Sequence, residues 1–193
     1  MQKFLPELPM SQEHNMIKNK KTSCILGVII TILLVVLDQF TKYLAVTNLK
    51  DGNSISIIKN VFQLQYLENR GAAFGMFQGG KVIFVMITIF LVAVMAYIYW
   101  HCPMSKRYLW IRIIITFLMA GAFGNLIDRI RLDYVIDFFY FELINFPIFN
   151  VADIYVSCSV VVLLLLFIFY YKEEDMEVLL PSKKKKDAGN EAK

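Results

Sequence analysis

The sequence predicts an all-α polytopic membrane protein with four transmembrane helices and a small extracytoplasmic β element. Hydrophobic residues make up 58% of the chain and charged residues only 19%, a balance too apolar for an ordinary soluble domain. Apolar runs of about twenty residues, the length that a helix needs to cross a hydrocarbon core of about 30 Å, recur along the chain. All five prolines lie outside these runs or at their very start, as expected if the runs are helical.

The four predicted spans are residues 24–46, 82–100, 108–127 and 148–171. The first could alternatively be a cleaved export signal, because lysines precede its apolar stretch. That stretch is followed by Asp-Gln-Phe-Thr-Lys rather than by a small-x-small cleavage site, and apolar residues resume up to Val46. This pattern favours a retained span.

Lysine and arginine residues predict how the chain is oriented. They are concentrated before the first span, between the second and third, and after the fourth, whereas the two other loops mix basic and acidic residues. We therefore expect both termini in the cytoplasm. The predicted parts are a cytoplasmic N-terminal segment (1–23), a membrane domain (24–171) with extracytoplasmic loops at about 47–81 and 128–147, and a charged cytoplasmic tail (172–193).

The net charge of +4 comes from the cytoplasmic lysines. The lysine-rich tail fits contact with anionic lipid better than with nucleic acid, and a solvated tail is the alternative. The three cysteines have no paired or metal-ligand spacing, which predicts ordinary thiols.

The loop after the first span predicts the β element. Residues 54–58 and 61–67 alternate polar with apolar or β-branched side chains, and Asp51-Gly52-Asn53 supplies a turn before them. The chain shows no internal repeat, which weakens a transporter interpretation based on two inverted halves.

Four acids are expected in one layer at the extracytoplasmic boundary. Asp38 lies about two-thirds of the way along the first span, Asp128 directly follows the third, and Asp153 lies one to two turns into the fourth. Asp137 lies in the short loop between the last two spans. Acids in or near a span are costly, so their placement indicates a functional site.

Two carboxylates held close together in a partly desolvated site tend to share one proton. The ionised member can then remove a proton from water while the protonated member donates one, without a metal or a covalent nucleophile. Asp137 and Asp153 could form such a pair. The alternative is that the acids only neutralise cations or cap helices; Asp38 and Lys42, at i and i+4, could be a simple ion pair.

Five short segments resemble the ordered motifs of bacterial lipoprotein signal peptidases (signal peptidase II). They cover roughly residues 24–171, and together they are far more specific than any one alone. The segments are Asp38-Gln-Phe-Thr-Lys42, Asn69-Arg-Gly-Ala-Ala-Phe74, Gly121-Ala-Phe-Gly-Asn-Leu-Ile-Asp-Arg129, Val135-Ile-Asp-Phe138 and Phe149-Asn-Val-Ala-Asp153.

The resemblance implies a multi-pass aspartic endopeptidase of the bacterial inner membrane that cleaves diacylglyceryl-modified prolipoproteins before the lipidated cysteine. It implies an active site on the extracytoplasmic side and no cofactor or metal, and we expect a monomer in contact with membrane lipid. The matching motifs make Asp137 and Asp153 the catalytic pair, with Asp128 as the rival for the first role. The residues expected to orient the pair or bind substrate are Asp38, Lys42, Asn69, Arg70, Gly71, Asn125, Asp128, Arg129, Asn150 and Ala152.

Three other classes of protein fit the sequence less well. A serine–lysine peptidase would have to use Ser54 or Ser56 with Lys59, in a segment where nothing marks a nucleophile. A zinc protease would need histidine ligands near the active site. The chain has two histidines, both expected in the cytoplasm, and it has no His-Glu-x-x-His motif. A proton-coupled transporter would spread its acids across the membrane rather than gather them at one face.

Overall fold

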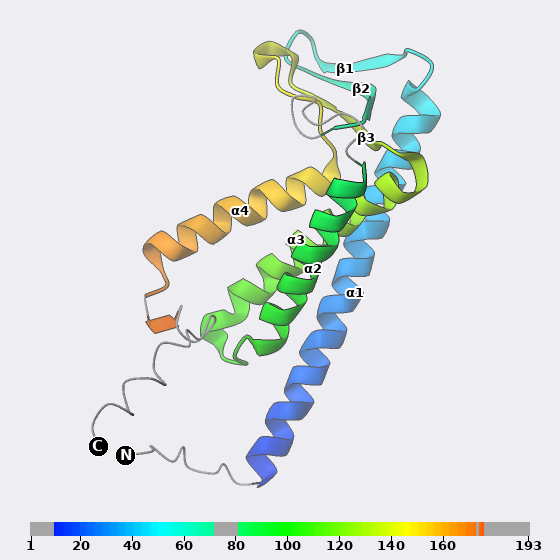
Figure 1. Ribbon diagram of the computed structural model, residues 1–193. Coiled ribbons are helices and arrows are strands. Elements are labelled where there is room, and N and C mark those ends of the chain that lie inside the picture. The colour runs from blue at the N-terminus through cyan, green and yellow to red at the C-terminus, as the bar shows by residue number, and fades with distance from the viewer. Residues whose placement is uncertain (1–9, 72–80, 173, 176–193) are drawn as a thin grey trace, which may run out of the picture.

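The structure is a computed structural model and describes residues 10–71, 81–172 and 174–175 (Figure 1). Its long helices are α1 (Met10–Leu49), α2 (Lys81–His101), α3 (Leu109–Leu132) and α4 (Val151–Phe169). All four contain a stretch long and apolar enough to cross a membrane, which confirms the predicted fold class. Residues 72–74 of the second motif and the lysine run at 183–186 lie outside the described residues.

Several helix ends differ from the predicted spans, because an apolar run marks only the lipid-facing part of a helix. The first helix begins at Met10, and the third continues past residue 127 to Leu132. Asp133, with a left-handed backbone (φ 67°), ends the third helix. Asp128 and Arg129 therefore lie inside α3 rather than after it, and Asp153 lies in the first turn of α4 rather than deeper.

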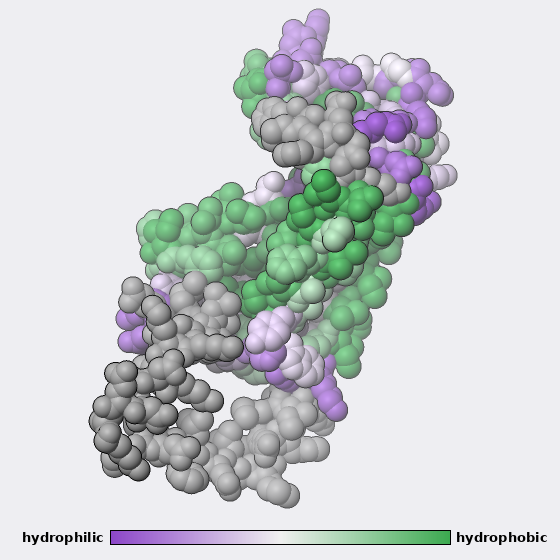
Figure 2. All heavy atoms as spheres, in the orientation of Figure 1, coloured by the Kyte–Doolittle hydropathy of each residue, from purple (hydrophilic) through white to green (hydrophobic). Residues whose placement is uncertain are grey.

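The outer surface of the helices is hydrophobic over most of their length (Figure 2). Large apolar side chains are exposed on every long helix, for example Leu33, Phe90, Ile113 and Leu164. Such a continuous apolar surface would be unfavourable in water and fits a lipid environment. Trp100 and Trp110, each about half exposed, lie where α2 ends and α3 begins.

A three-stranded antiparallel sheet lies at one end of the helices (Figure 1), in the order β1 (Ser54–Ile58), β2 (Phe62–Asn69) and β3 (Val135–Tyr140). The first two strands confirm the predicted β element. The third was expected to be loop, and its pairing with β2 sets Leu67 opposite Asp137. Short 3-10 helices, η2 (Lys106–Tyr108) and η3 (Glu142–Ile144), lie before α3 and after β3.

Two separate apolar clusters hold the ends of the molecule. One packs the sheet against the end of α1 and consists of Ala45, Leu49, Ile136 and Phe138. The other lies at the opposite end of the helices and consists of Cys102, Tyr108, Ile111, Ile115 and Tyr171. All three cysteines are free thiols. The acids gather beside the first cluster, at the sheet end of the helices.

Candidate active site

Asp137 lies on β3 and is only 1% exposed. Its Oδ1 accepts a hydrogen bond from Asn150 Nδ2 at 2.6 Å, and its Oδ2 accepts one from Asn69 Nδ2 at 2.8 Å. Burial, and secondly the neighbouring Asp153 carboxylate, raise the pKa of Asp137 to about 7, although the two amide donors and Lys42 act in the opposite direction. Asp137 can therefore exchange a proton near neutral pH.

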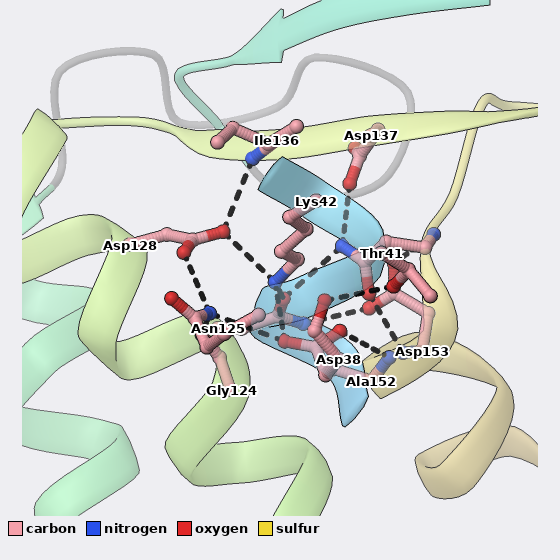
Figure 3. Close-up of polar contacts among 12 residues, drawn as sticks. Asp38, Thr41, Lys42, Gly124, Asn125, Asp128, Ile136, Asp137, Ala152 and Asp153 are labelled. Carbon is pink, nitrogen blue, oxygen red and sulfur yellow. Dashed lines mark hydrogen bonds and ion pairs between the residues drawn. The ribbon is translucent and has the colours of Figure 1, made fainter. Parts of the chain in front are cut away.

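Asp153 lies in the first turn of α4, where it forms a capping box with Asn150. Asn150 Oδ1 accepts from the Asp153 backbone N–H at 3.0 Å, and Asp153 Oδ2 accepts from the Asn150 backbone N–H at 3.1 Å. Asp153 Oδ1 accepts from Asn125 Nδ2 at 2.8 Å. Asn150 thus bonds to both candidate catalytic acids. Figure 3 shows Asp137 and Asp153 beside the polar network of Asp38, Lys42 and Asp128.

Each of the three asparagine amides has its orientation fixed by a bond to its oxygen. Asn69 Oδ1 accepts from the backbone N–H of Gly71 at 3.0 Å, and Asn125 Oδ1 accepts from Lys42 Nζ at 2.9 Å. Asn150 Oδ1 is held by the cap described above. Because the oxygens are occupied, the NH₂ groups must point at the carboxylates. The amides hold both acids in place without adding charge.

Lys42 lies buried between two further acids and is 1% exposed. Its Nζ lies 3.0 Å from Asp38 Oδ2 and 2.8 Å from Asp128 Oδ2, and it also bonds to Asn125 as described above. The predicted i, i+4 pair of Asp38 and Lys42 is therefore confirmed, but the pair belongs to a larger network. A buried ammonium group is tolerated only when such partners surround it.

Asp38 and Asp128 each bind the backbone directly before a candidate catalytic acid. Asp38 Oδ1 accepts from the Ala152 N–H at 2.9 Å, and Ala152 precedes Asp153. Asp128 Oδ2 accepts from the Ile136 N–H at 3.2 Å, and Ile136 precedes Asp137. These two acids are 0% and 2% exposed. Their contacts suit positioning of the chain better than contact with a substrate.

Two glycines allow α3 to approach its neighbours closely. A Cβ atom on Gly121 would lie 2.6 Å from the carbonyl oxygen of Ala152, and one on Gly124 would lie 2.6 Å from Asp38 Oδ2. The missing side chains therefore let α3 pack closely against α1 and α4. Close packing here brings the acids of α1, α3 and α4 into one network.

Two arginines and Gly71 of the predicted set lie around the acids. Arg129 contacts the Asn125 carbonyl oxygen through Nη1 at 3.4 Å, and its guanidinium lies 5.0 Å from the Phe84 ring centroid. Arg70 is exposed and pairs with Glu68 at 3.1 Å. Gly71 is buried beside Asn69. Arg70 is therefore on the exposed rim of the site, and within the described residues it forms no salt bridge with any of the four acids.

Gln39 was not predicted as a site residue, yet its amide ties α1 to α3. Its Nε2 donates to Asp38 Oδ2 at 3.2 Å, to Asp128 Oδ1 at 2.9 Å and to the Gly124 carbonyl at 3.1 Å. Its place in the first motif, between Asp38 and Lys42, is the signal that could have indicated it.

The residues required by the other chemical classes lie elsewhere. Ser54 and Ser56 are exposed on β1, away from the buried network. His101 lies at the far end of α2, against Tyr97, with ring centroids 4.1 Å apart and ring planes tilted by 32°. Within the described residues, no group of three or more His, Cys, Asp and Glu side chains could hold a metal ion.

The fold and the site define a multi-span membrane protein with two carboxylates at one end of its helices, each held by asparagine amides. This arrangement is suited to acid–base chemistry on water. A sequence model of the family described as "Signal peptidase (SPase) II" matches residues 30–169. The lipoprotein signal peptidase of Clostridium novyi is 43% identical over 138 residues, which cover 69% of this chain and 91% of that protein. The corresponding protein of Latilactobacillus sakei is 41% identical over 137 residues, which cover 71% and 89%.

A solved structure described as a bacterial membrane enzyme shares the fold, with a TM-score of 0.66 and 32% identity. The match covers 77% of this chain and 92% of that one. The chain belongs to the signal peptidase II family, and it is a peptidase. The family resemblance predicted from the five motifs is therefore confirmed.

Proposed function

We propose that this peptidase removes signal peptides from diacylglyceryl-modified prolipoproteins, cleaving before the lipidated cysteine, with Asp137 and Asp153 as its catalytic pair. The observation that carries the proposal is that Asn150 bonds to both acids in a buried site, where burial raises the pKa of Asp137 to about 7. Such a pair can hold one proton at neutral pH. The relatives named lipoprotein signal peptidases support the substrate class.

In the proposed reaction, Asp137 carries the shared proton because its pKa is raised. Asp153 acts as the base and takes a proton from water as the water oxygen attacks the scissile carbonyl carbon. Asp137 donates its proton toward the developing oxyanion, and the pair then delivers a proton to the leaving amine as the C–N bond breaks. The products are the signal peptide with a new carboxylate and the lipoprotein with a free amino terminus.

The surrounding residues position this pair in the proposal. Asn69, Asn125 and Asn150 hold the carboxylates, while Asp38 and Asp128 fix the chain before them. Arg70, on the exposed rim, is available to bind substrate main chain. Asp128 was the rival for the catalytic role, but its oxygens already accept from Gln39, Lys42 and the β3 backbone.

The proposed location is the bacterial inner membrane, with both termini in the cytoplasm and the acids at the extracytoplasmic side. The sheet and the four acids lie at one end of the helices, and the turn between α2 and α3, which carries Lys106 and Arg107, lies at the other (Figure 1). The positive-inside rule places that basic turn in the cytoplasm. We also propose that the protein acts as a monomer.

A cleavage assay with purified components tests the proposed reaction. The full chain in detergent–lipid micelles is given a prolipoprotein in two forms, one carrying the diacylglyceryl group on its cysteine and one unmodified. We expect cleavage of the modified form alone, with mass spectrometry placing the new amino terminus at the lipidated cysteine. Equal cleavage of both forms would contradict the proposed specificity.

The same assay separates the peptidase classes through its inhibitors. A serine-reactive inhibitor and a metal chelator are each added to parallel reactions. Turnover is expected to persist in both, because the proposed reaction uses neither a serine nucleophile nor a metal. Loss of turnover with either reagent would refute the proposed aspartate mechanism.

A further inference from the structure

Arg112 is a buried cation at the end of the helices opposite the acids. It is the fourth residue of α3 and is only 6% exposed. Its Nη2 donates to the carbonyl oxygens of Cys102 and Pro103, at 2.7 and 2.8 Å. Among the described residues, no carboxylate forms a salt bridge with it, and its buried Nε makes no hydrogen bond.

This arrangement leaves a positive charge and a donor unsatisfied inside the protein. A buried charge without a counter-charge is strongly unfavourable, and so is a buried N–H without an acceptor. The two carbonyl bonds explain why Arg112 helps to hold the end of α2. They do not supply the negative charge or the acceptor for Nε.

Arg112 also lines a cavity of about 210 Å³ between α1, α2 and α3. Most of the other lining residues are apolar, including Leu26, Ile30, Leu109 and Phe117. The first three of these are 53%, 44% and 50% exposed on the lipid-facing surface. The cavity therefore combines one cationic wall with an apolar wall that reaches the surrounding hydrocarbon.

The level of this cavity matches that of lipid headgroups. Trp100 and Trp110 lie at the same end of the helices, and tryptophan rings favour the membrane interface. Lys20, whose Nζ lies 4.6 Å from the Trp100 ring centroid, adds a second positive charge nearby. Guanidinium groups bind phosphate oxygens through paired N–H donors.

We propose that this cavity is a binding site for an anionic phospholipid, whose phosphate meets Arg112 and whose acyl chain lies along Leu26, Ile30 and Phe117. A phosphate would supply the negative charge that the two carbonyl bonds to Arg112 do not. The apolar wall favours a lipid over free phosphate. The site is distinct from the acids and takes no part in the proposed peptide cleavage.

Native mass spectrometry of the full chain in detergent tests the proposal. The protein is incubated with phosphatidylglycerol or with diacylglycerol of the same acyl chains, and retained lipid is counted. We expect the parent to retain phosphatidylglycerol but not diacylglycerol. Arg112→Gln should bind phosphatidylglycerol at least about tenfold more weakly than the parent. The matched control, Lys106→Gln, removes an exposed charge from the same end without touching the cavity and should bind as the parent does.

A second variant keeps the test decisive if Arg112→Gln does not fold. Ile30→Trp fills the apolar part of the cavity from a partly exposed position and leaves Arg112 in place. It should also lose phosphatidylglycerol. Retention by both variants at the level of the parent would overturn the proposal, as would displacement of the lipid by an equal concentration of inorganic phosphate.

Discussion

Asp137 is a buried acid whose titration falls near neutral pH. Folding raises its pKa from an ordinary value of 3.8 to about 7, chiefly through burial. The fold therefore favours the protonated form. The contribution of this group to stability is complete below about pH 3.8 and is lost as the pH rises through 7. Above neutral pH the pair would also lose its shared proton, so activity should fall on the alkaline side.

Replacing Asn69 with alanine should shift the alkaline fall in activity to higher pH. The Asn69 amide donates to Asp137 and lowers its pKa, so its removal raises the pKa further. The shared proton then persists to higher pH, and the fall in kcat/KM shifts upward. The measurement is kcat/KM against pH with a lipidated substrate. Asn48→Ala, which removes an exposed amide that donates to the Leu44 carbonyl, should leave the pH of this fall unchanged. An unchanged pH dependence in Asn69→Ala would contradict the assignment.

Lys42 is the residue whose loss should most destabilise the site. In Lys42→Met the carboxylates of Asp38 and Asp128 remain buried without their cation. Breaking such a buried network costs about 3–5 kcal/mol. We expect a much lower unfolding temperature in detergent and poor recovery of folded protein.

Lys50→Met is the matched control for this change. Lys50 pairs with Glu68 at 3.6 Å at the surface, where an ion pair contributes about 0–1 kcal/mol. Its unfolding temperature should stay near that of the parent. If the two lysine variants unfolded at the same temperature, the network around Lys42 would not have the structural role described here.

At the scale of elements, the close contact of α3 with α1 and α4 decides where the acids lie. In Gly124→Ala the new methyl group would meet Asp38 Oδ2 at 2.6 Å and the Ala152 Cβ at 3.1 Å. Both neighbours are fixed by other contacts, so the helices must separate. We expect reduced peptidase activity and a lower unfolding temperature, measured on the purified variant.

Gly27→Ala makes the same chemical change on α1 as a control. Its new Cβ would meet only the Tyr99 side chain, with the hydroxyl at 2.5 Å, and the end of a tyrosine side chain can move. Alanine improves the intrinsic helix propensity equally at both positions. Similar activity losses in the two variants would show that helix contact at Gly124 is not special.

The elements also show where prediction from sequence fails. The apolar runs predicted all four spans because burial in lipid leaves a strong compositional signal. Strand β3 could not be predicted in this way, since its partner β2 is more than sixty positions earlier and its core side chains form no alternating pattern. The third helix continues past its apolar run because Asp128 and Arg129 find partners within the protein rather than in water.

The motifs predicted the acids and amides but not how they connect. Nothing in the sequence indicates that Asp38 binds the N–H of Ala152, or that Asp128 binds the N–H of Ile136. These bonds depend on the placement of α4 and β3 against α1 and α3. They also explain why Asp128 lies so near the site without being assigned the catalytic role.

At the scale of the whole molecule, the two ends have different chemistry. The acids and the sheet lie at one end, and the basic turn between α2 and α3 lies at the other (Figure 1). The proposed topology places them on opposite sides of the membrane. Ser54 and Ser105 are exposed on these two ends and provide sites for a direct test.

Single cysteines at these positions report the topology. In a chain whose own cysteines are replaced by serine, Ser54→Cys should react with a membrane-impermeant maleimide added to intact spheroplasts. Ser105→Cys should react only after the membrane is opened. The reverse pattern would invert the proposed orientation and place the acids in the cytoplasm.

The central claim is that Asp137 and Asp153 act as one water-activating pair, and its most direct test is turnover of a lipidated prolipoprotein by three purified variants. Asp137→Asn and Asp153→Asn keep the side-chain shape but cannot carry the shared proton, so each should lose turnover by about a thousandfold or more while remaining folded. Asp128→Asn should unfold at a lower temperature yet keep measurable turnover. A folded but inactive Asp128→Asn beside an active Asp137→Asn would contradict the account and exchange their roles.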